Sequence, residues 1–430
     1  MNIVVTGVGY VGLVTAVCMA DMGHNVACVE QDENKVKNLK NGIPVIFEPD
    51  VSELMKRNKN RLTYTTNYKS CYSDADVIFI CVGTPERRDG YANLAYIYEA
   101  ARQIANSAQK EMVVSVKSTV PIGTCKKIEQ EMNAVSKYKI SVVSNPEFLS
   151  QGTAVRDTIN AERIVIGVNC ENTLNVMKEV YKGLDELLLI TDRESSEMIK
   201  YASNDFLALK ISYINEIANL CEMVGANIED VAKGMGLDSR IGNKFLNAGI
   251  GYGGSCFPKD TKALHWLAKY HDYELKTVKA AIEVNESQKI KLIKKARKYY
   301  KSFKGLNVAV LGLTFKPNTD DLREAPSLEN IPLFLDDGAN VRVWDKVGAC
   351  NFKKLFGDSM TYCETIGDTI RNADICFIFT EWDDIKSFPL SEYKKLMKTP
   401  LVLDGRNCYS LSDVKKANIV YDSVGRPLVS

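Results

Sequence analysis

The sequence predicts an α/β protein with two parallel-sheet lobes joined by a central helical domain. Near its start, short β-branched runs alternate with helical patterns. Residues 2–6 are expected to form a buried strand, residues 11–22 a helix closed by Gly23, and residues 25–30 a second strand. Further strands are expected at residues 75–82 and 112–116. Strands that alternate with helices indicate βαβ units and therefore a parallel sheet.

The same pattern returns near the end of the chain, which predicts a second lobe of the same kind. Three short segments of the first lobe are echoed, in the same order, in the last third of the sequence. Such ordered echoes indicate two Rossmann-like lobes rather than one large sheet. The echoed pairs are residues 2–7 with 307–312, residues 23–26 with 338–341, and residues 74–78 with 372–376. Because all βαβ units share this alternation of apolar strands and helices, chance similarity of strands is the alternative explanation.

The composition changes between the two lobes. Residues 195–224 contain no Gly or Pro and are expected to form a helix about 45 Å long. Its apolar residues at helical spacing are Ile199, Ala202, Phe206, Leu209, Ile211, Ile214, Ile217 and Leu220. A second helix is expected at residues 283–300, followed by a linker at 301–305. These features predict three domains: residues 1–192, residues 193–300 with the long helix, and residues 301–430.

Composition and charge exclude several function classes. Of the 430 residues 45% are hydrophobic and 25% charged, and the formal net charge is +1, so neither nucleic acid nor an anionic membrane is an expected partner. We expect no secretory signal, and apolar runs such as residues 77–82 fall short of the roughly 20 residues that span a bilayer. Twelve cysteines without a CxxC pair, with only three histidines, predict reduced thiols in the cytoplasm and no metal site.

A glycine-rich element follows the first predicted strand and opens the first predicted helix. Gly7, Gly9 and Gly12 form a GxGxxG pattern: the first suits a tight turn, the second a close approach of a pyrophosphate, and the third helix–strand packing. Glu30 ends the second strand, where a carboxylate can bind ribose hydroxyls and repel a ribose phosphate. NAD is therefore expected rather than NADP. Lys35 is either a pyrophosphate contact or a solvated surface lysine.

The most informative segment is residues 251–260, GYGGSCFPKD. Glycines allow close backbone approach to a ligand. If a helix begins near Pro258, Cys256 lies just before its N-terminus, a position that lowers the pKa of a thiol. A cysteine is most often a packing residue, but these neighbours favour a nucleophile. A dinucleotide fold with a nucleophilic thiol predicts a dehydrogenase that oxidises its substrate to the acid level through a thioester.

At this point the chain resembles the UDP-glucose 6-dehydrogenases, within the nucleotide-sugar dehydrogenase family. The motifs that carry the resemblance, besides the Cys256 segment, are VGTP at residues 82–85, STVP at 118–121, NPEFL at 145–149, and GLTFK at 312–316 with Arg323 and Glu324. The family resemblance implies an NAD-binding lobe and a UDP-sugar-binding lobe bridged by a long dimerisation helix. It also implies a homodimer or a larger homo-oligomer.

The resemblance implies roles for single residues. Cys256 would be the nucleophile, and Lys200 with Asn204, one helical turn apart, would stabilise the sugar oxyanion. Asp260 with Thr119 would hold a water for proton transfer, and Glu147 would assist thioester hydrolysis. The implied cofactor contacts are Gly7, Gly9, Tyr10, Val11, Gly12, Glu30, Lys35, Thr84, Thr119 and Arg323. The implied substrate contacts are Glu147, Phe148, Leu149, Lys200, Asn204, Arg240 from the neighbouring subunit, Phe245, Tyr252, Gly253, Phe315, Lys316 and Arg406.

Some of these residues could have ordinary structural roles, and two positions differ from the usual family pattern. Lys200 could be a solvated lysine, Glu147 a helix cap, and Arg406 a surface ion pair. Gln151 stands where many family members have a second glutamate, and Glu30 stands where aspartate is commoner. UDP-glucose is the expected substrate; a UDP-N-acetylhexosamine or GDP-mannose is the alternative. A non-catalytic NAD-binding descendant and a two-electron hydroxyacid dehydrogenase are the remaining alternatives, and the second leaves the cysteine segment without a purpose.

Overall fold

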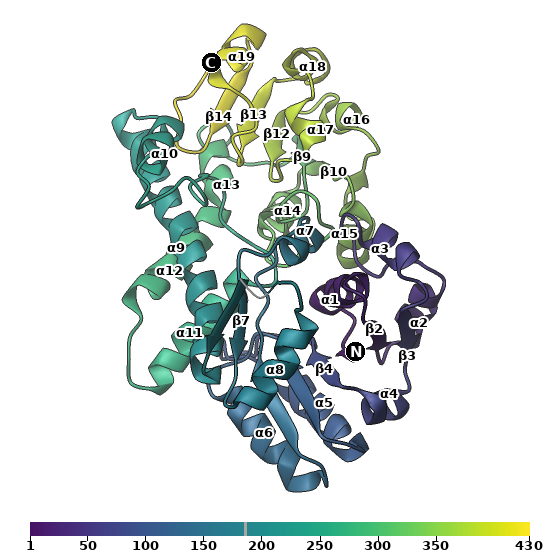
Figure 1. Ribbon diagram of the computed structural model, residues 1–430. Helices are drawn as coiled ribbons and strands as arrows, with labels where there is room; N and C mark the ends of the chain where they lie inside the picture. The colour runs from purple at the N-terminus through teal and green to yellow at the C-terminus, as the bar shows by residue number, and fades with distance from the viewer. Residues whose placement is uncertain (185–186) are drawn as a thin grey trace. The chain divides into compact units, whose positions relative to one another are not determined.

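The computed structural model describes residues 1–184 and 187–430, and it divides into two compact units (Figure 1). The first unit contains Met1–Ser203 and Trp266–His271. The second contains Asn204–His265 and Asp272–Ser430. Two helices belong partly to each unit, namely α9 (Arg193–Val224) and α11 (Phe257–Tyr270).

The described strands of the first unit form one sheet in the order β3-β2-β1-β4-β5-β6-β7-β8. Neighbours are parallel except β6 and β7, which meet antiparallel. The order of β1 to β6 is that of a Rossmann sheet. The strands are β1 (Asn2–Thr6), β2 (Asn25–Val29), β3 (Leu62–Thr65), β4 (Val77–Ile80), β5 (Met112–Val116), β6 (Ile140–Ser144), β7 (Ile164–Gly167) and β8 (Leu188–Thr191). The helices are α1 (Tyr10–Asp21), α2 (Glu33–Lys40), α3 (Val51–Arg57), α4 (Tyr68–Asp74), α5 (Ala95–Ser107), α6 (Thr124–Val135), α7 (Ala154–Ile159) and α8 (Glu171–Val180).

The second unit contains a parallel sheet in the order β11-β10-β9-β12-β13-β14, drawn in green and yellow in Figure 1. Its strands are β9 (Asn307–Leu311), β10 (Asn340–Trp344), β11 (Thr361–Tyr362), β12 (Ile375–Ile378), β13 (Leu401–Asp404) and β14 (Val420–Ser423). Its further helices are α10 (Ile228–Gly236), α12 (Lys276–Lys289), α13 (Lys291–Ala296), α14 (Pro326–Asp336), α15 (Ala349–Phe356), α16 (Ile366–Ile370), α17 (Asp383–Lys386), α18 (Leu390–Leu396) and α19 (Leu411–Ala417). Nowhere in the described parts of the chain is a helix both long and apolar enough to cross a membrane.

The echoed sequences have the same structural role in both lobes. The backbone N–H of Asn2 donates to Asp76 Oδ2 at 2.9 Å, and that of Asn307 donates to Asp374 Oδ2 at 2.9 Å. Each aspartate lies just before the strand that pairs with the first strand of its lobe. The prediction of two Rossmann-like lobes is therefore confirmed, and the repeated aspartate connects equivalent strands in each.

Each sheet separates two apolar clusters, which explains why the strands are apolar almost throughout. In β1, Val5 packs into one cluster and Val4 into the cluster on the other face. In β9, Val310 and Leu311 divide in the same way. Successive side chains of a strand point to opposite faces, and a parallel sheet is covered on both.

The second predicted helix is wrong in its bounds. Instead of one helix at residues 283–300, α12 begins at Lys276, and α12 and α13 are separated at Ile290, where φ is −98° and ψ is 11°. The Lys289 carbonyl accepts a hydrogen bond from Asn330 Nδ2 at 2.9 Å, and Lys289 Nζ pairs with Glu324 at 2.7 Å. The break therefore coincides with tertiary contacts to the neighbouring α14 region, which leave no local sequence signal.

The long helix α9 is confirmed, and its two sides are unusual. Polar residues lie on the inner side: Asn204, Asp205 and Asn215 are buried. Apolar residues lie on the outer side, where Phe206 is 61% and Leu220 53% exposed. Apolar residues such as Ile214 and Ala218 are buried on the inner side as well, so that side is mixed. The exposed apolar residues are the departure from an ordinary amphipathic helix, whose outer side is polar. The inner side of α9 is therefore suited to a polar site, and its outer side to contact with another chain.

Candidate active site

The glycine-rich turn after β1 has a distinct steric reason at each glycine. Gly7 has φ +87°, and a Cβ there would lie 2.9 Å from Val82 Cγ1. A Cβ on Gly12 would lie 1.9 Å from the Gly7 carbonyl oxygen, so this glycine allows α1 to pack close to the turn. A Cβ on Gly9 would meet no atom of the described chain within 4 Å. Space is thus left above Gly9, as close approach of a ligand requires.

The N-terminus of α1 is open to an anion. The helix begins at Tyr10, has no side-chain cap at Gly9, and has no acidic residue in its first turn. The first backbone N–H groups of a helix have no intrahelical partner and favour negative charge. The Tyr10 hydroxyl donates to Glu48, and Glu48 also accepts the Gly152 N–H at 2.6 Å. Tyr10 is therefore held by the protein itself, while the amides of the helix start remain available.

Glu30 lies beside the glycine turn, at the end of β2. Its Oε2 accepts the Val8 N–H at 3.1 Å, and its Oε1 accepts the Gln31 N–H at 2.9 Å. Lys35 Nζ lies 3.8 Å from Glu30 Oε2, with the lysine side chain 44% and the glutamate side chain 13% exposed. The carboxylate is fixed next to the turn, as expected for a ribose contact. The half-exposed Lys35 side chain thus reaches Glu30.

The loops after β4 and β5 are joined by hydroxyl groups. Thr84 Oγ1 donates to the Thr119 carbonyl at 3.0 Å, and Ser118 Oγ donates to the Val82 carbonyl at 2.6 Å. Both loops follow the carboxyl ends of parallel strands, the edge at which such sheets bind ligands. The structure thus brings Thr84 and Thr119 together at the ligand-binding edge of the first sheet.

Glu147 and Lys200 form a buried ion pair in the first unit. Lys200 Nζ lies 3.0 Å from Glu147 Oε1, and their side chains are 3% and 7% exposed. Glu147 Oε2 also accepts the Leu149 N–H at 2.6 Å. Burial raises the pKa of the Glu147 carboxyl, but the Lys200 charge and the Leu149 amide outweigh it, so the pKa lies below its ordinary value. Lys200 is therefore not a solvated lysine, and Glu147 is not merely a cap.

Two cations lie close to the Phe148 ring. The Arg163 guanidinium is 4.1 Å and Lys200 Nζ 5.4 Å from the centroid of the Phe148 ring. An aromatic face attracts a cation and shields it from water on one side. Phe148 thereby helps to fix the position of the Lys200 ammonium group.

The glycines before Cys256 are required by contacts within the second unit. A Cβ on Gly253 would lie 2.4 Å from the Glu324 carbonyl oxygen. Gly254 has φ +84°, and its Cβ would lie 2.8 Å from Phe315 Cζ. The Gly254 N–H donates to the Arg323 carbonyl at 2.7 Å. The sequence favoured ligand approach as the reason for these glycines, and the structure shows that packing against Phe315 and Glu324 already requires them.

Cys256 occupies the predicted position at the start of a helix. α11 begins at the next residue, and the Cys256 carbonyl accepts the Asp260 N–H at 2.8 Å, so Cys256 caps the helix. Hydrogen bonding to Asp321 raises the pKa of the Arg323 guanidinium, and the nearby Cys256 adds to this effect. The half-buried thiol thus lies near both a helix N-terminus and a cation, two features that favour thiolate.

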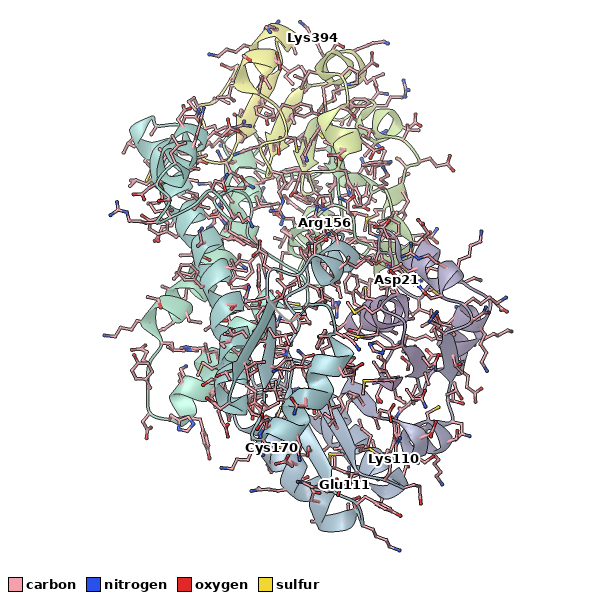
Figure 2. All side chains as sticks on the ribbon, in the orientation of Figure 1. Asp21, Lys110, Glu111, Arg156, Cys170 and Lys394 are labelled. Atoms are coloured by element: carbon pink, nitrogen blue, oxygen red, sulfur yellow. The ribbon has the colours of Figure 1, made fainter. Side chains whose placement is uncertain are left out.

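Buried cysteines differ from Cys256 in ways that fit packing roles, whereas one exposed cysteine does not. Cys18 and Cys81 are buried, and burial raises the pKa of each thiol to about 12. The exposed Cys170, labelled in Figure 2, precedes α8, and hydrogen bonds from the Thr173 side chain and backbone lower its pKa. Cys170 is therefore the appropriate control when thiol reactivity is measured.

Asp260 is held by two neighbours on the inner side of the second unit. Asn204 Nδ2 donates to Asp260 Oδ2 at 2.7 Å, and Lys259 Nζ forms an ion pair with the other carboxylate oxygen. Asp260 is 1% exposed. The buried Asp205, the residue after Asn204, was missed by the sequence reasoning. No local sequence feature distinguishes Asp205 from a solvated acidic residue.

Aromatic residues surround the start of α11. The Phe257 ring lies 5.9 Å from Tyr252 and 6.3 Å from Phe245, measured between centroids. Phe245 has φ +65°, a costly conformation for a bulky residue, which is found most often at functional sites. Burial raises the pKa of the Tyr252 hydroxyl to about 12, so this residue stays neutral.

Arg406, after β13, joins the cysteine segment to the second sheet. Its Nη1 donates to the Gly251 carbonyl at 3.1 Å and its Nη2 to the Phe315 carbonyl at 3.2 Å. Lys316 Nζ lies 5.6 Å from the centroid of the Phe315 ring. Arg406 is therefore more than a surface ion pair, because it orients the segment that carries Cys256.

Two predicted arginines are exposed. The side chain of Arg240 is 87% exposed and bonds only locally, with Nη2 at 2.6 Å from Asp238 Oδ2. The side chain of Arg323 is 63% exposed and binds Asp321 through two nitrogen atoms, at 2.9 and 2.7 Å. Both guanidinium groups are held by an aspartate two residues before them, which limits their freedom while leaving them accessible.

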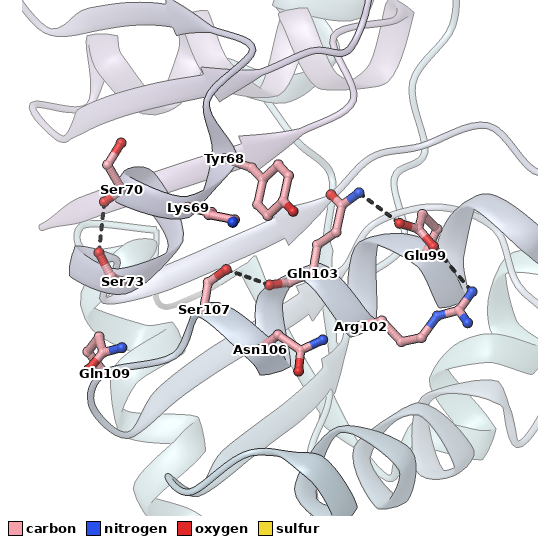
Figure 3. Close-up of a pocket in the computed structure, with 10 residues that line it drawn as sticks. All are labelled: Tyr68, Lys69, Ser70, Ser73, Glu99, Arg102, Gln103, Asn106, Ser107 and Gln109. Carbon is pink, nitrogen blue, oxygen red and sulfur yellow. Dashed lines mark hydrogen bonds and ion pairs between the residues drawn. The ribbon is translucent and has the colours of Figure 1, made fainter.

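A surface hollow of about 710 Å³ lies elsewhere in the first unit, between α4 and α5 (Figure 3). Its lining includes none of the predicted site residues, and its polar groups bond largely to one another, as between Gln103 and Glu99. The hollow is lined by Tyr68, Lys69, Ser70, Ser73, Glu99, Arg102, Gln103, Asn106, Ser107 and Gln109. It is therefore not the candidate site.

Comparison with known proteins assigns a family to this arrangement. Residues 1–185 match the NAD binding domain of the UDP-glucose/GDP-mannose dehydrogenase family, residues 194–287 its central domain, and residues 309–411 its UDP binding domain. The UDP-glucose 6-dehydrogenase YwqF of Bacillus subtilis (strain 168) is 47% identical, with 100% of this chain and 98% of that protein covered. The UDP-glucose 6-dehydrogenase of Rhizobium meliloti (strain 1021) is 46% identical, with 99% and 100% covered.

Solved structures of two dehydrogenases have a similar fold. The UDP-glucose dehydrogenase of the archaeon Pyrobaculum islandicum has a TM-score of 0.93 at 36% identity, with 99% of this chain and 98% of that chain covered. The UDP-D-ManNAc dehydrogenase of Pyrococcus horikoshii has a TM-score of 0.87 at 25% identity, with 99% of each chain covered. The resemblance noted from the sequence motifs is confirmed by these matches. This chain therefore belongs to the UDP-glucose/GDP-mannose dehydrogenase family.

Proposed function

We propose that this protein oxidises the C6 alcohol of UDP-glucose to the carboxylate of UDP-glucuronate, with two molecules of NAD. The observation that carries the proposal is the half-buried Cys256 thiol at the start of α11, in a loop that Arg406 and Phe315 hold in place. Oxidation of an alcohol only to the carbonyl level has no use for a thiol, whereas oxidation to the acid uses one to form a thioester. The names of the relatives support UDP-glucose as substrate.

The first unit fits NAD. The space above Gly9 admits a pyrophosphate, the start of α1 offers amides from Tyr10 and Val11, and Glu30 is placed for ribose hydroxyls. Bound there, NAD supplies the hydride acceptor for both oxidations. Thr84, Thr119 and Lys35 are assigned to the same cofactor, as is Arg323 of the second unit. The carboxylate of Glu30 should exclude a 2′-phosphate by charge repulsion.

In the first oxidation, C6 loses a hydride and the alcohol oxygen loses its proton to a water assigned to Asp260 and Thr119. This step leaves an aldehyde. The Cys256 sulfur then adds to C6, and the thiol proton is transferred to the new alkoxide oxygen to give a thiohemiacetal. Lys200 and Asn204 stabilise the negative charge that develops on this oxygen.

In the second oxidation, C6 loses another hydride, the oxygen loses its proton, and a thioester to Cys256 remains. Water attacks this thioester, the C–S bond breaks, and the sulfur takes up a proton. Glu147 assists by accepting a proton from the water; Gln151 cannot exchange protons. The balance is one alcohol, one water and two NAD consumed, with one carboxylate, two NADH and three protons produced.

Substrate contacts extend around these reacting groups. We assign the sugar nucleotide to Phe148, Leu149, Phe245 and Tyr252, together with Gly253, Phe315, Lys316 and Arg406. The aromatic cluster around Phe257 and the positive φ of Phe245 support this assignment. Arg240 is assigned to a substrate bound by the neighbouring subunit, in keeping with its 87% exposed side chain.

A homodimer in the cytoplasm is part of the proposal. Phe206, Tyr213 and Leu220 recur every seven residues on the outer side of α9 and are 61%, 48% and 53% exposed. Such a row is typical of helices that pack against a second helix.

Cytoplasmic location is proposed because the reaction needs Cys256 as a free thiol, which a reducing compartment preserves. The division at residues 192 and 300 is likewise proposed, and the three matched family segments support it.

The test is to mix purified protein with NAD and a panel of nucleotide sugars while following NADH absorbance. UDP-glucose should give two NADH per sugar and a carboxylate that mass spectrometry identifies. One NADH per sugar with a released aldehyde would refute the four-electron reaction. A clear preference for a UDP-N-acetylhexosamine or GDP-mannose would instead assign the same chemistry to the alternative substrate.

A further inference from the structure

Asp205 is a buried carboxyl group that the proposed reaction does not use. It follows Asn204 on α9 and is 4% exposed. Among the described residues neither of its oxygens has a hydrogen-bond partner. Its neighbour Asn204 donates to Asp260 at 2.7 Å, and the Asp260 charge acts on Asp205, so the two carboxyl groups belong to one cluster. An ionised carboxylate without a partner is costly to bury, and a second negative charge nearby adds to the cost.

The two carboxyl groups are stabilised unequally. Asp260 accepts a hydrogen bond from the Asn204 amide and pairs with the Lys259 ammonium. Asp205 has neither, and burial, followed by the Asp260 charge, raises the pKa of Asp205 to about 8. Tyr252, on the loop before α11, is close enough for the Asp205 charge to act on it, and Glu286 of α12 acts on Tyr252 in turn. At neutral pH the carboxyl group of Asp205 therefore holds a proton.

We propose that Asp205 is a positioning residue for Asp260: it carries a proton at neutral pH and, when it loses that proton, its negative charge makes Asp260 a stronger proton acceptor. The proposal rests on the proposed function, in which Asp260 takes part in proton transfer. No step is added to the reaction, because the proton on Asp205 exchanges with solvent between turnovers. The consequence is a second ionisation in the pH dependence of the reaction, on the alkaline side of neutrality.

The variant Asp205→Asn tests this role, because an amide has the shape of the neutral carboxyl group but does not ionise. Below pH 7 its kcat/KM for UDP-glucose should stay within about 3-fold of the wild type. Between pH 7 and 9.5 the ratio of wild type to variant should rise at least about 5-fold, with its midpoint near 8. Asp205→Ala should lose the same rise. Asp336→Asn, at an exposed position in the same unit, should keep it.

A second measurement does not depend on activity. The pKa of Asp205 is raised on folding, so its protonation stabilises the folded protein fully below the unfolded value of 3.8, and this contribution is lost as pH rises through about 8. The Tm of the wild type minus that of Asp205→Asn should therefore fall between pH 5 and 8 and level off above. Asp336→Asn should show no such trend.

The outcomes separate the two claims. An active wild type with a flat or falling activity ratio between pH 7 and 9.5 overturns the role of Asp205. A Tm difference that does not change with pH overturns its protonation. If the wild type does not oxidise UDP-glucose at all, the proposed function fails, and the Tm series still decides whether Asp205 holds the proton.

Discussion

Removing the charge of Lys200 should destabilise the folded protein and also slow the oxidation of the substrate. In Lys200→Met, Glu147 keeps the Leu149 amide but loses its cation while remaining buried. Breaking one partner of a buried ion pair costs about 3–5 kcal/mol, because an uncompensated charge is left behind. For a unit of this size that cost lowers Tm by about 6–20 °C. The lost oxyanion contact should lower kcat by about 10²–10³-fold.

The assay is urea-induced unfolding followed by circular dichroism, on a double-variant cycle with Glu147→Gln. Glutamine can still accept the Leu149 N–H, so Lys200→Met with Glu147→Gln should recover most of the lost stability without recovering activity. Lys182→Met is the matched control, because Lys182 pairs with Glu179 at 3.3 Å with both side chains largely exposed. Such a pair contributes only about 0–1 kcal/mol.

The stability cost of Lys200→Met should depend on pH, in a direction set by the Glu147 carboxyl. The pKa of Glu147 is lowered on folding, so the stability it contributes is present above the unfolded value of 4.5 and is lost as pH falls through the folded value. Without Lys200, burial dominates and opposes the charged form, so the penalty of Lys200→Met should be larger at pH 7 than at pH 4. A cost below about 1 kcal/mol at pH 7, or no recovery in the double variant, would refute the buried pair as described.

Three further predictions follow from the site and from α9. Cys256→Ser should bind NAD and UDP-glucose but accumulate a covalent adduct or stall near the aldehyde, whereas Cys256→Ala should form no adduct. Intact-protein mass spectrometry distinguishes these outcomes. Near wild-type turnover by both variants would make Cys256 a packing residue. NAD should be preferred over NADP by at least about 10-fold in kcat/KM, or about 1.4 kcal/mol. Glu30→Ala should reduce that preference. Equal use of both cofactors by the wild type would show that Glu30 does not face the ribose. Light scattering should find a homodimer or larger assembly that Phe206→Glu with Leu220→Glu weakens, and a fully active wild-type monomer at micromolar concentration would contradict this assembly.

Much of the candidate site was accessible from the sequence because its residues occupy local positions. Gly7, Gly9 and Glu30 belong to one βαβ unit, whose geometry follows from strand and helix periods. Cys256 was recognised because glycines precede it and a helix was expected from Pro258 onward, and in the structure that helix begins at Phe257. The spacing of Lys200 and Asn204 placed them one turn apart on one helix.

Other features depend on segments far apart in the chain. The pairing of Lys200 with Glu147 joins residues 53 positions apart. Arg406 donates to the Gly251 carbonyl across 155 positions. Asp205 was overlooked because nothing nearby in the sequence distinguishes a buried acidic residue from a solvated one. The break between α12 and α13 was missed for the same reason, since its cause is a contact from Asn330.

The sequence by itself determined the two Rossmann-like lobes, the long helix α9, the glycine turn and the cysteine at a helix start, because each follows from periodicity or from a short motif. Only the tertiary structure decided which side of α9 is buried, which groups are charged, and why Gly253 and Gly254 cannot carry side chains. The physical reason is that local sequence specifies backbone conformation and side-chain chemistry. Burial, and with it the ionisation of Glu147 and Asp205, depends on which distant residues pack around them.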